Sequence, residues 1–264
     1  MDQRAREEIA AALLGAYDSG EPIDPPTERH PDLAPDDAYE IQLLQVSRWI
    51  AAGARVAGHK VGLTSAAMQR QMGVYQPDYG HLLDRMFWLE YEPIPVSRFL
   101  QPRVEPEIAF VMSARLAGPG VTMPAAMAVI AAVHGAVSTD AGFFACGPVG
   151  LPPGSVDLTL EACLVEVNGQ VVDSATGAAV MGHPAQALAQ AANQLGDRGL
   201  AIEPGWIVLA GGMTEAVTVP AGRPMAAHFT SLGSVFLPLS ITDRGASRGR
   251  RQPPAAAVAA GMPT

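Results

Sequence analysis

Apolar residues recur at the spacing of a helix in the first fifty positions of the chain and at the spacing of strands over much of the remainder. The pattern predicts one helix over residues 2–18 and a second that starts near residue 36 and ends before Gly53, each with an apolar stripe along one side. Asp36 or Asp37 can cap the second helix. Because only one side of each helix is apolar, we expect the two helices to form a cover over another part of the chain.

Short apolar runs separated by glycine and proline turns begin near residue 55. Residues 65–72 are predicted to form a short helix, residues 123–137 a helix that runs into a strand, and the segment from Pro184 a longer helix. The dipeptide at residues 168–169, Asn-Gly between two strand-like runs, is typical of a hairpin with a type I′ turn. The strands and turns that follow are typical of a β-roll or sandwich.

These patterns divide the chain into three parts. We expect an N-terminal helical cover over residues 1–54 and a β-roll domain with the catalytic residues over residues 55–242. The tail, residues 243–264, has a low-complexity sequence that predicts disorder.

Composition narrows the class of protein. Charged residues make up 16% and hydrophobic residues 48% of the 264 residues, so we expect some apolar surface to be covered in a homo-oligomer. A formal net charge of -9 argues against a nucleic-acid partner, which requires a basic face. Two cysteines are too few for a disulfide framework, and no segment resembles a signal peptide or a membrane span. We therefore expect a soluble cytoplasmic protein with no membrane partner.

A predicted strand at residues 104–112, VEPEIAFVM, is the first candidate for chemistry. Glu105 and Glu107 lie two positions apart, so both carboxylates point to the same face. Pro106 cannot donate a ladder hydrogen bond, which predicts an edge or a bulge with free backbone beside the carboxylates. Two oxygen ligands in such a place suit Mg2+ or Mn2+. Acids at alternate positions are also typical of the solvated face of a half-buried strand, so the pattern alone leaves both interpretations open.

Two further polar residues stand out. Lys60 lies within an apolar, glycine-flanked strand, where a lysine either extends its ammonium group to solvent or meets a negative partner. Asp78 lies in a Pro-Asp-Tyr-Gly sequence, which is ordinary turn chemistry. The glycines around Lys60 lack the spacing of a phosphate-binding loop, so nucleotide binding is not expected.

Several separated motifs carry a resemblance to a known family. They are GHKVGLTS (58–65), QMGVYQPDYGHLL (71–83), VEPEIAF (104–110), VNGQVV (167–172), GAAVMGHP (177–184), GGMT (211–214) and LGSV (232–235). In this order they resemble the 2-keto-4-pentenoate hydratase and 4-oxalocrotonate decarboxylase family of the fumarylacetoacetate hydrolase-like superfamily, over about residues 36–241. The resemblance implies an α+β fold in which N-terminal helices pack on a curved mixed β-roll of the fumarylacetoacetate hydrolase C-terminal type.

The resemblance also implies roles for individual residues. Glu105 and Glu107 match paired ligands for Mg2+ or Mn2+, which would chelate the carboxylate and 2-oxygen of a small 2-oxo or 2-hydroxy acid substrate. Lys60 matches a lysine that stabilises enolate charge or relays a proton. Asp78 matches an acid that assists proton transfer or positions water.

Thr64 and Ser65, which follow Lys60 in the same motif, are implied to bind substrate. One departure concerns the metal, because relatives carry a third metal-ligating glutamate in a Pro-Ala-Ile-Glu segment that is shortened here. His134 falls at the place of that glutamate and would favour Mn2+, Fe2+ or Zn2+ over Mg2+. A buried histidine in an apolar run explains His134 equally well, and the meaning of His59, beside Lys60, is also left open.

The leading hypothesis is a lyase of aromatic-compound catabolism that hydrates a 2-hydroxy-2,4-dienoate to a 4-hydroxy-2-oxo acid. A metal-dependent decarboxylase of an oxalocrotonate-like acid is the nearest alternative. A diverged isomerase, cyclase or other lyase acting on a larger substrate, with or without metal, is a further one. A non-catalytic assembly subunit is least compatible with the sequence, because Lys60, Asp78, Glu105 and Glu107 are all retained.

Overall fold

The computed structural model describes residues 1–95, 99, 101–139, 143–220 and 222–240. The tail predicted over residues 243–264 lies outside these residues. The helices of the described part are α1 (Gln3–Ser19), α2 (Pro26–Arg29), α3 (Pro35–Ala51), α4 (Ala66–Met72), α5 (Met123–Met127) and α6 (Pro184–Gly196). Its strands are β1 (Val56–Gly62), β2 (Asp78–Leu83), β3 (Ile94–Pro95), β4 (Arg103–Met112), β5 (Ile130–Thr139), β6 (Phe144–Leu151), β7 (Ala162–Val167), β8 (Gln170–Thr176), β9 (Ile207–Leu209), β10 (Val217–Thr218), β11 (Met225–Phe229), β12 (Gly233–Leu237) and β13 (Leu239–Ser240).

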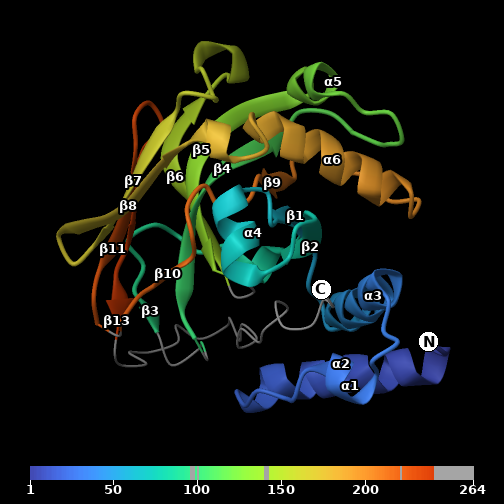
Figure 1. Cartoon of the computed structure of the whole chain (residues 1–264). Coiled ribbons are helices and arrows are strands. Elements are labelled where there is room, and N and C mark those ends of the chain that lie inside the picture. The colour runs from blue at the N-terminus through green and yellow to red at the C-terminus, as the bar shows by residue number, and fades with distance from the viewer. Residues whose placement is uncertain (96–98, 100, 140–142, 221, 241–264) are drawn as a thin grey trace.

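The described strands form three sheets. The largest has the order β2-β1-β9-β4-β5-β6, with β10 paired to β4, and the second has the order β12-β11-β7-β8. Strands β1 and β9 run parallel, whereas β4 runs antiparallel to both β5 and β9, so the large sheet is mixed. Helices α1–α3 lie together at one side of the sheets (Figure 1). The predicted α+β fold class, with N-terminal helices and a mixed sheet, is confirmed, while the domain boundaries at residues 54 and 242 stay predictions.

The local patterns explain most of these elements. The expected helices correspond to α1, α3, α4 and α6, and residues 123–137 contain α5 followed by most of β5. The β7-β8 hairpin turns at Asn168 and Gly169, whose φ angles of 54° and 81° are the positive values that a type I′ turn requires. These predictions are confirmed. In the described residues, no helix is long and apolar enough to cross a membrane.

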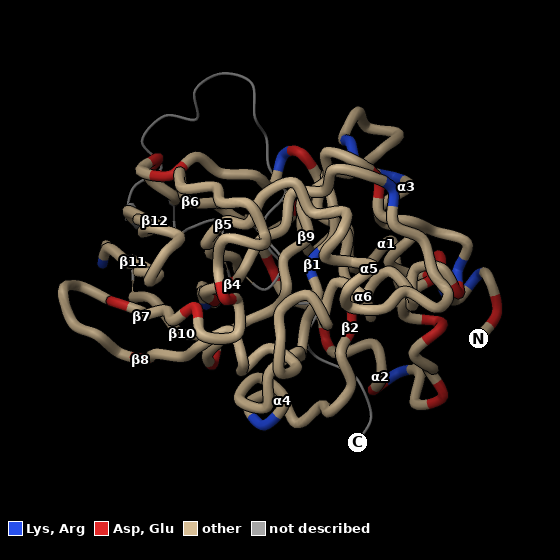
Figure 2. The backbone as a smooth tube through the Cα atoms, turned by 90° about the horizontal axis from the view of Figure 1, so that it is seen from above, with Lys and Arg blue, Asp and Glu red and all other residues tan. Residues whose placement is uncertain are grey.

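The start of α3 differs from the prediction. The N-cap position is Ala34, so Asp36 and Asp37 lie in the first turn of the helix. Asp37 accepts a hydrogen bond from the backbone N–H of Ala34 at 3.2 Å and forms an ion pair with Arg6 of α1 at 2.7 Å. This carboxylate therefore joins the two long helices. Figure 2 shows charged residues gathered on α1–α3 and sparser over the sheets.

Aromatic contacts attach this helical cover to the edge of the large sheet. The ring of Tyr39, in α3, stacks on Tyr79, in β2, with 4.6 Å between centroids. The guanidinium of Arg198 lies 4.3 Å from the centroid of the Tyr39 ring and pairs with Asp36 at 2.5 Å. A cation over an aromatic face stabilises such an arrangement by roughly 0.5–2 kcal/mol.

Strand β4 is an interior strand, which corrects the expectation of an edge or a bulge at Pro106. Pro106 pairs with Val137 of β5, and the register shift in β4 occurs only near its far end, between Val111 and Met112. On the other side, β10 pairs with β4 up to Val104 and β9 pairs from residue 109. Pro106 lies between these two pairings, so its missing N–H interrupts neither ladder.

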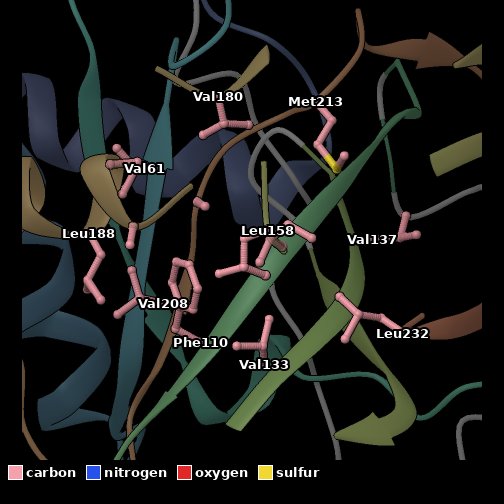
Figure 3. Close-up of a cluster of buried hydrophobic side chains, with 14 of the residues drawn as sticks. Val61, Phe110, Val133, Val137, Leu158, Val180, Leu188, Val208, Met213 and Leu232 are labelled. Atoms are coloured by element: carbon pink, nitrogen blue, oxygen red, sulfur yellow. The ribbon is translucent and has the colours of Figure 1, made fainter. Parts of the chain in front are cut away.

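The main core lies on one face of the large sheet. Figure 3 shows Val61 of β1, Phe110 of β4 and Val208 of β9 near Leu188 of α6, and each of these side chains is fully buried. Burial stabilises each of them by roughly 1.5–3 kcal/mol relative to exposure. Because strand side chains alternate, the residues adjacent to these strand positions point to the opposite face, where the candidate site lies.

His59 lies on the core side of β1, away from the side chain of Lys60. It pairs in register with His81 of β2. The centroid of the His59 ring lies 4.8 Å from that of His81 and 5.5 Å from that of Trp206. Burial lowers the pKa of His59 to about 3 and that of His81 to about 4. Both imidazoles are therefore neutral in the folded protein at ordinary pH.

This histidine pair predicts a loss of stability in mild acid. Each folded-state pKa lies below the unfolded value of about 6.5, so the contribution to stability is complete above that pH and is lost as the pH falls. At pH 5 each neutral histidine costs about 2 kcal/mol of unfolding free energy relative to pH 7.5. Urea unfolding at both pH values measures this loss, and His59→Gln should reduce it by about that amount.

The difference in pH-dependent stability between wild type and His59→Gln measures the contribution of His59. Burial raises the pKa of Asp78 and of Glu107, and carboxyl groups with raised pKa values act in the opposite sense, stabilising the fold as pH falls. An equal loss in wild type and His59→Gln would show that His59 does not contribute.

Candidate active site

Strand register brings three of the predicted residues to one face of the large sheet. Glu105 lies opposite Ser138 of β5, and Glu107 lies opposite Ala136. Directly opposed residues of an antiparallel pair point to the same face. Lys60 lies on β1, and the short strand β9 lies between β1 and β4 in the sheet. The site therefore depends on the pairing of strands that are distant in sequence.

Lys60 forms ion pairs with both glutamates. Its Nζ donates a hydrogen bond to Glu105 Oε2 and lies 3.2 Å from Glu107 Oε1. It also donates to Ser138 Oγ at 2.8 Å. Glu105 is 2% exposed and Glu107 0% exposed, so both carboxyl groups are shielded from water. The structure thus resolves the two alternatives for Lys60, because its ammonium group meets negative partners.

Glu107 has donors on both carboxylate oxygens. Ser138 donates its hydroxyl hydrogen to Glu107 Oε1, and the backbone N–H of Gly211 donates to Oε2 at 2.6 Å. Burial raises the pKa of Glu107, while the charge of Lys60 and these two donors act in the opposite direction. The glutamates are therefore not on a solvated face of the strand, which was the alternative interpretation of the pattern.

Gly211 has a backbone conformation that glycine favours. Its φ angle is 98°, and a Cβ atom there would lie 2.0 Å from Thr64 Oγ1. Thr64 in turn donates its hydroxyl hydrogen to the carbonyl of Ala210 at 2.9 Å. Thr64 therefore fixes the segment whose N–H group holds Glu107. Ser65 caps α4 by accepting a hydrogen bond from Met68 N–H at 3.2 Å. A substrate-binding role for Thr64 and Ser65 stays a prediction.

Asp78 begins β2, directly opposite Gly62 of β1. A Cβ atom at Gly62 would lie 2.1 Å from Asp78 Oδ1, so the absence of a side chain at Gly62 makes room for this carboxyl group. Burial raises the pKa of Asp78, and the nearby charge of Lys60 lowers it in part. A raised pKa favours the protonated form of this carboxyl group, which a general acid requires.

His134 is not among the residues that contact this pair of glutamates in the described structure. It lies opposite Ala109 on β5, four residues before Ser138. Its Nδ1 hydrogen-bonds with the carbonyl of Gly147 at 3.0 Å, and its ring lies close to Gly150. The role of His134 as a metal ligand stays a prediction that these contacts do not support.

Ser138 is the residue that the sequence analysis missed. No motif marks it, since a serine in an apolar strand is common, and only the β4-β5 register places it against Glu105. The register is set across a connection that contains α5 and a shift near Met112. Counting residues along the sequence could not identify this partner.

The donor set suits a hard divalent cation. Glu105, Glu107 and Ser138 offer oxygen atoms only, which Mg2+ prefers. Within the described residues, however, no cluster of three or more His, Cys, Asp or Glu side chains could hold a metal ion. The residues present therefore fit a divalent ion that takes two carboxylates and completes its shell with hydroxyl, water or substrate oxygens.

Apolar side chains flank the charged group on the same face. A buried cluster includes Ala109 of β4, Ala136 of β5, Phe144 of β6 and Leu209 of β9. Strands β4 and β5 carry the glutamates and Ser138, β9 pairs with β1, and β6 pairs with β5. Low-polarity surroundings strengthen electrostatic interactions at the carboxylates and Lys60.

Comparison with known proteins finds close relatives. No protein-family model matches the chain. A 2-hydroxypent-2,4-dienoate hydratase of Pseudomonas putida is 37% identical over 222 residues, covering 76% of this chain and 100% of that protein. A 2-keto-4-pentenoate hydratase of Paraburkholderia xenovorans is 33% identical and covers 89% of this chain and 95% of that protein. A 4-oxalocrotonate decarboxylase of a Pseudomonas species is 34% identical, with 87% and 93% covered.

Solved structures agree with the sequence relatives. A 4-oxalocrotonate decarboxylase of Pseudomonas putida, complexed with magnesium and adipate, superposes with a TM-score of 0.86 at 30% identity and covers 90% of this chain and 98% of that chain. A fumarylpyruvate hydrolase of Pseudomonas aeruginosa, in complex with Mn2+ and pyruvate, has a TM-score of 0.58 at 13% identity, with 70% and 89% covered. The second similarity shows the fold alone.

Proposed function

Because the chain belongs to the family of 2-keto-4-pentenoate hydratases and 4-oxalocrotonate decarboxylases, we propose that it is a hydro-lyase acting on a 2-hydroxy-2,4-dienoate. The product would be a 4-hydroxy-2-oxo acid. The observation that carries the proposal is the meeting of Lys60, Glu105 and Glu107 on one face of the sheet, with Asp78 on the adjoining strand β2.

Each residue would have a role that fits its environment. The Lys60 ammonium would bind the substrate carboxylate or the 2-oxygen and stabilise negative charge as the dienol becomes a ketone. Asp78, whose raised pKa favours the protonated form, would donate a proton to carbon during this ketonisation, while the enol hydroxyl gives up its proton to solvent. The ketone polarises the remaining double bond, and water adds at its far end. A divalent ion at Glu105 and Glu107, Mg2+ or Mn2+, would supply Lewis-acid chemistry at the substrate oxygens.

Decarboxylation of an oxalocrotonate-like acid is the second candidate. It is supported by the superposition on a 4-oxalocrotonate decarboxylase at a TM-score of 0.86. The same Lys60 and carboxylate pair would stabilise the enolate that loss of CO2 leaves behind. Hydration is preferred because most of the similar sequences are named hydratases.

Turnover measurements test the two reactions directly. Wild-type enzyme incubated with 2-hydroxypenta-2,4-dienoate and Mg2+ should cause a loss of the dienoate absorbance. NMR of the reaction mixture should identify 4-hydroxy-2-oxopentanoate as the product. Lys60→Met should lower kcat by about a thousandfold, because it removes the charge that stabilises the enolate. Arg4→Met, which removes one exposed positive charge on α1, should leave kcat unchanged.

Three outcomes contradict the proposal in different ways. CO2 release from oxalocrotonate without hydration of the dienoate would favour the decarboxylase. Turnover of neither substrate would reject both activities. Near-normal turnover by Lys60→Met would exclude the assigned role of Lys60.

The contact between Gly62 and Asp78 gives a second prediction. Gly62→Ala should displace the Asp78 carboxyl group, since the new Cβ would lie 2.1 Å from Oδ1 in the present geometry. We expect kcat to fall by about tenfold to a hundredfold, because a small misplacement of a catalytic group costs this much. Gly15→Ala in α1, where an added Cβ meets nothing within 4 Å, is the matched control. Equal kcat values for both variants would contradict a catalytic role of Asp78 in this position.

A homo-oligomer is supported by the outer face of the sheet β12-β11-β7-β8. Leu164, Val171 and Phe236 are 45%, 59% and 37% exposed, and the strand pairing places them on one face. Tyr91 stacks on Phe236 with 5.5 Å between ring centroids, and the same face also carries the Glu166–His228 pair. We expect a second subunit to cover it.

Light scattering at micromolar concentration measures this state. Wild type should exceed the monomer mass of 27.5 kDa, and Leu164→Glu should shift it toward the monomer, because a charge would be buried in the contact. A monomeric wild type would contradict the proposal.

A further inference from the structure

Lys60 is the only lysine in the sequence of 264 residues, and its ammonium group lies between the two buried glutamates. One positive charge therefore faces two carboxylates and a neutral hydroxyl from Ser138. A cation between two acidic oxygen ligands occupies the kind of position that a divalent metal would take. The ammonium group and the metal thus depend on the same oxygen atoms, Glu105 Oε2 and Glu107 Oε1.

We propose that Lys60 is the resident cation of this carboxylate pair in the ligand-free protein, and that a divalent ion must displace its ammonium group to bind. The inference rests on the metal position included in the proposed function. Two cations at hydrogen-bond distance from the same oxygens repel each other strongly in a site shielded from water. Metal binding and the Lys60 ion pairs therefore exclude one another.

Ser138 is the residue that makes this competition possible. Its hydroxyl donates to Glu107 and accepts from Lys60, so it holds the ammonium group against the carboxylate pair. A hydroxyl adds no negative charge, whereas a third carboxylate at this position would leave enough charge for both cations. With both carboxyl groups ionised, the site holds two negative charges and one positive charge, and a divalent ion in addition leaves it positive.

The substrate would relieve the competition. A 2-oxo acid brings a carboxylate that can pair with the displaced ammonium group, and its oxygens can complete the shell of the ion. The affinity for the free ion should therefore be weak in the absence of such an acid and stronger in its presence. This linkage is reciprocal, because an acid that raises the affinity of the site for the metal must itself bind more tightly when the metal is bound.

Metal titration of a variant without the ammonium group tests the competition. Calorimetry with Mn2+ alone should give Lys60→Met an affinity at least about tenfold higher than wild type, because one competing charge has been removed. Lys60→Gln keeps a polar side chain in the same space and should behave in the same direction if Lys60→Met does not fold. Arg4→Met is the matched control for a change in net charge and should bind Mn2+ like wild type.

The single lysine allows a direct observation of its displacement. Protein labelled with carbon-13 at the lysine Cε position should give one Cε signal, which belongs to Lys60. Saturating Mg2+ together with pyruvate should shift this signal, since the ammonium group exchanges Glu105 and Glu107 for a new partner. In Lys60→Met, pyruvate should change the Mn2+ affinity less than it does in wild type.

The outcomes separate this inference from the proposed function. Mn2+ binding to both Lys60 variants that is no tighter than to wild type would overturn the competition, and so would a Cε signal that stays unchanged at saturation. Either result is compatible with hydration of a dienoate by the wild-type enzyme. Absence of hydration, together with tighter Mn2+ binding by Lys60→Met, would instead reject the function and keep the competition.

Discussion

Two carboxylates buried side by side are the constraint on which the site depends. Placing an ionised carboxyl group in a shielded position costs several kcal/mol unless a partner of opposite charge and further hydrogen-bond donors are present. Lys60 supplies the charge for both Glu105 and Glu107. Ser138 and the N–H group of Gly211 satisfy the oxygens of Glu107. Removing any one of these partners would leave a buried acid without full compensation.

This requirement extends outward into the fold. Gly211 donates its N–H to Glu107 from a backbone conformation that glycine favours, and Thr64 fixes the adjoining carbonyl of Ala210. Strand β9, three residues long, lies between β1 and β4, so Lys60 of β1 lies on one side of the glutamates of β4 and Ser138 of β5 lies on the other. Lys60, which stabilises the buried charges, is also the group that would bind an anionic substrate, so stability and chemistry share this residue.

The sequence predicted elements well where a local rule decides the outcome. The hairpin at Asn168 and Gly169 follows from a turn that requires positive φ, and α6 follows from Pro184 at its first position. The prediction for Pro106 was wrong because proline excludes a ladder bond only on one side of a strand. The sheet accommodates it in the gap between β10 and β9, and that tertiary arrangement has no local signal.

The candidate site shows the same division. The alternation of side chains in β4 predicted that both glutamates share a face. The family motifs implied a lysine beside them, and the ion pairs of Lys60 agree with that expectation. The partner on β5 could not be predicted, because a register shift near Met112 and the intervening α5 decide whether His134 or Ser138 stands opposite Glu105. A shift of register moves every side chain of a strand relative to its neighbour.

A double-mutant cycle between Lys60 and Glu107 tests the central claim most directly. Urea unfolding at pH 7.5 gives the free energy for wild type, Lys60→Met, Glu107→Gln and the double variant. If Lys60 neutralises the buried carboxylates, the double variant should lose at least about 2 kcal/mol less than the sum of the single losses. Losses that add to within about 0.5 kcal/mol would show that the two residues are not coupled and would contradict the account.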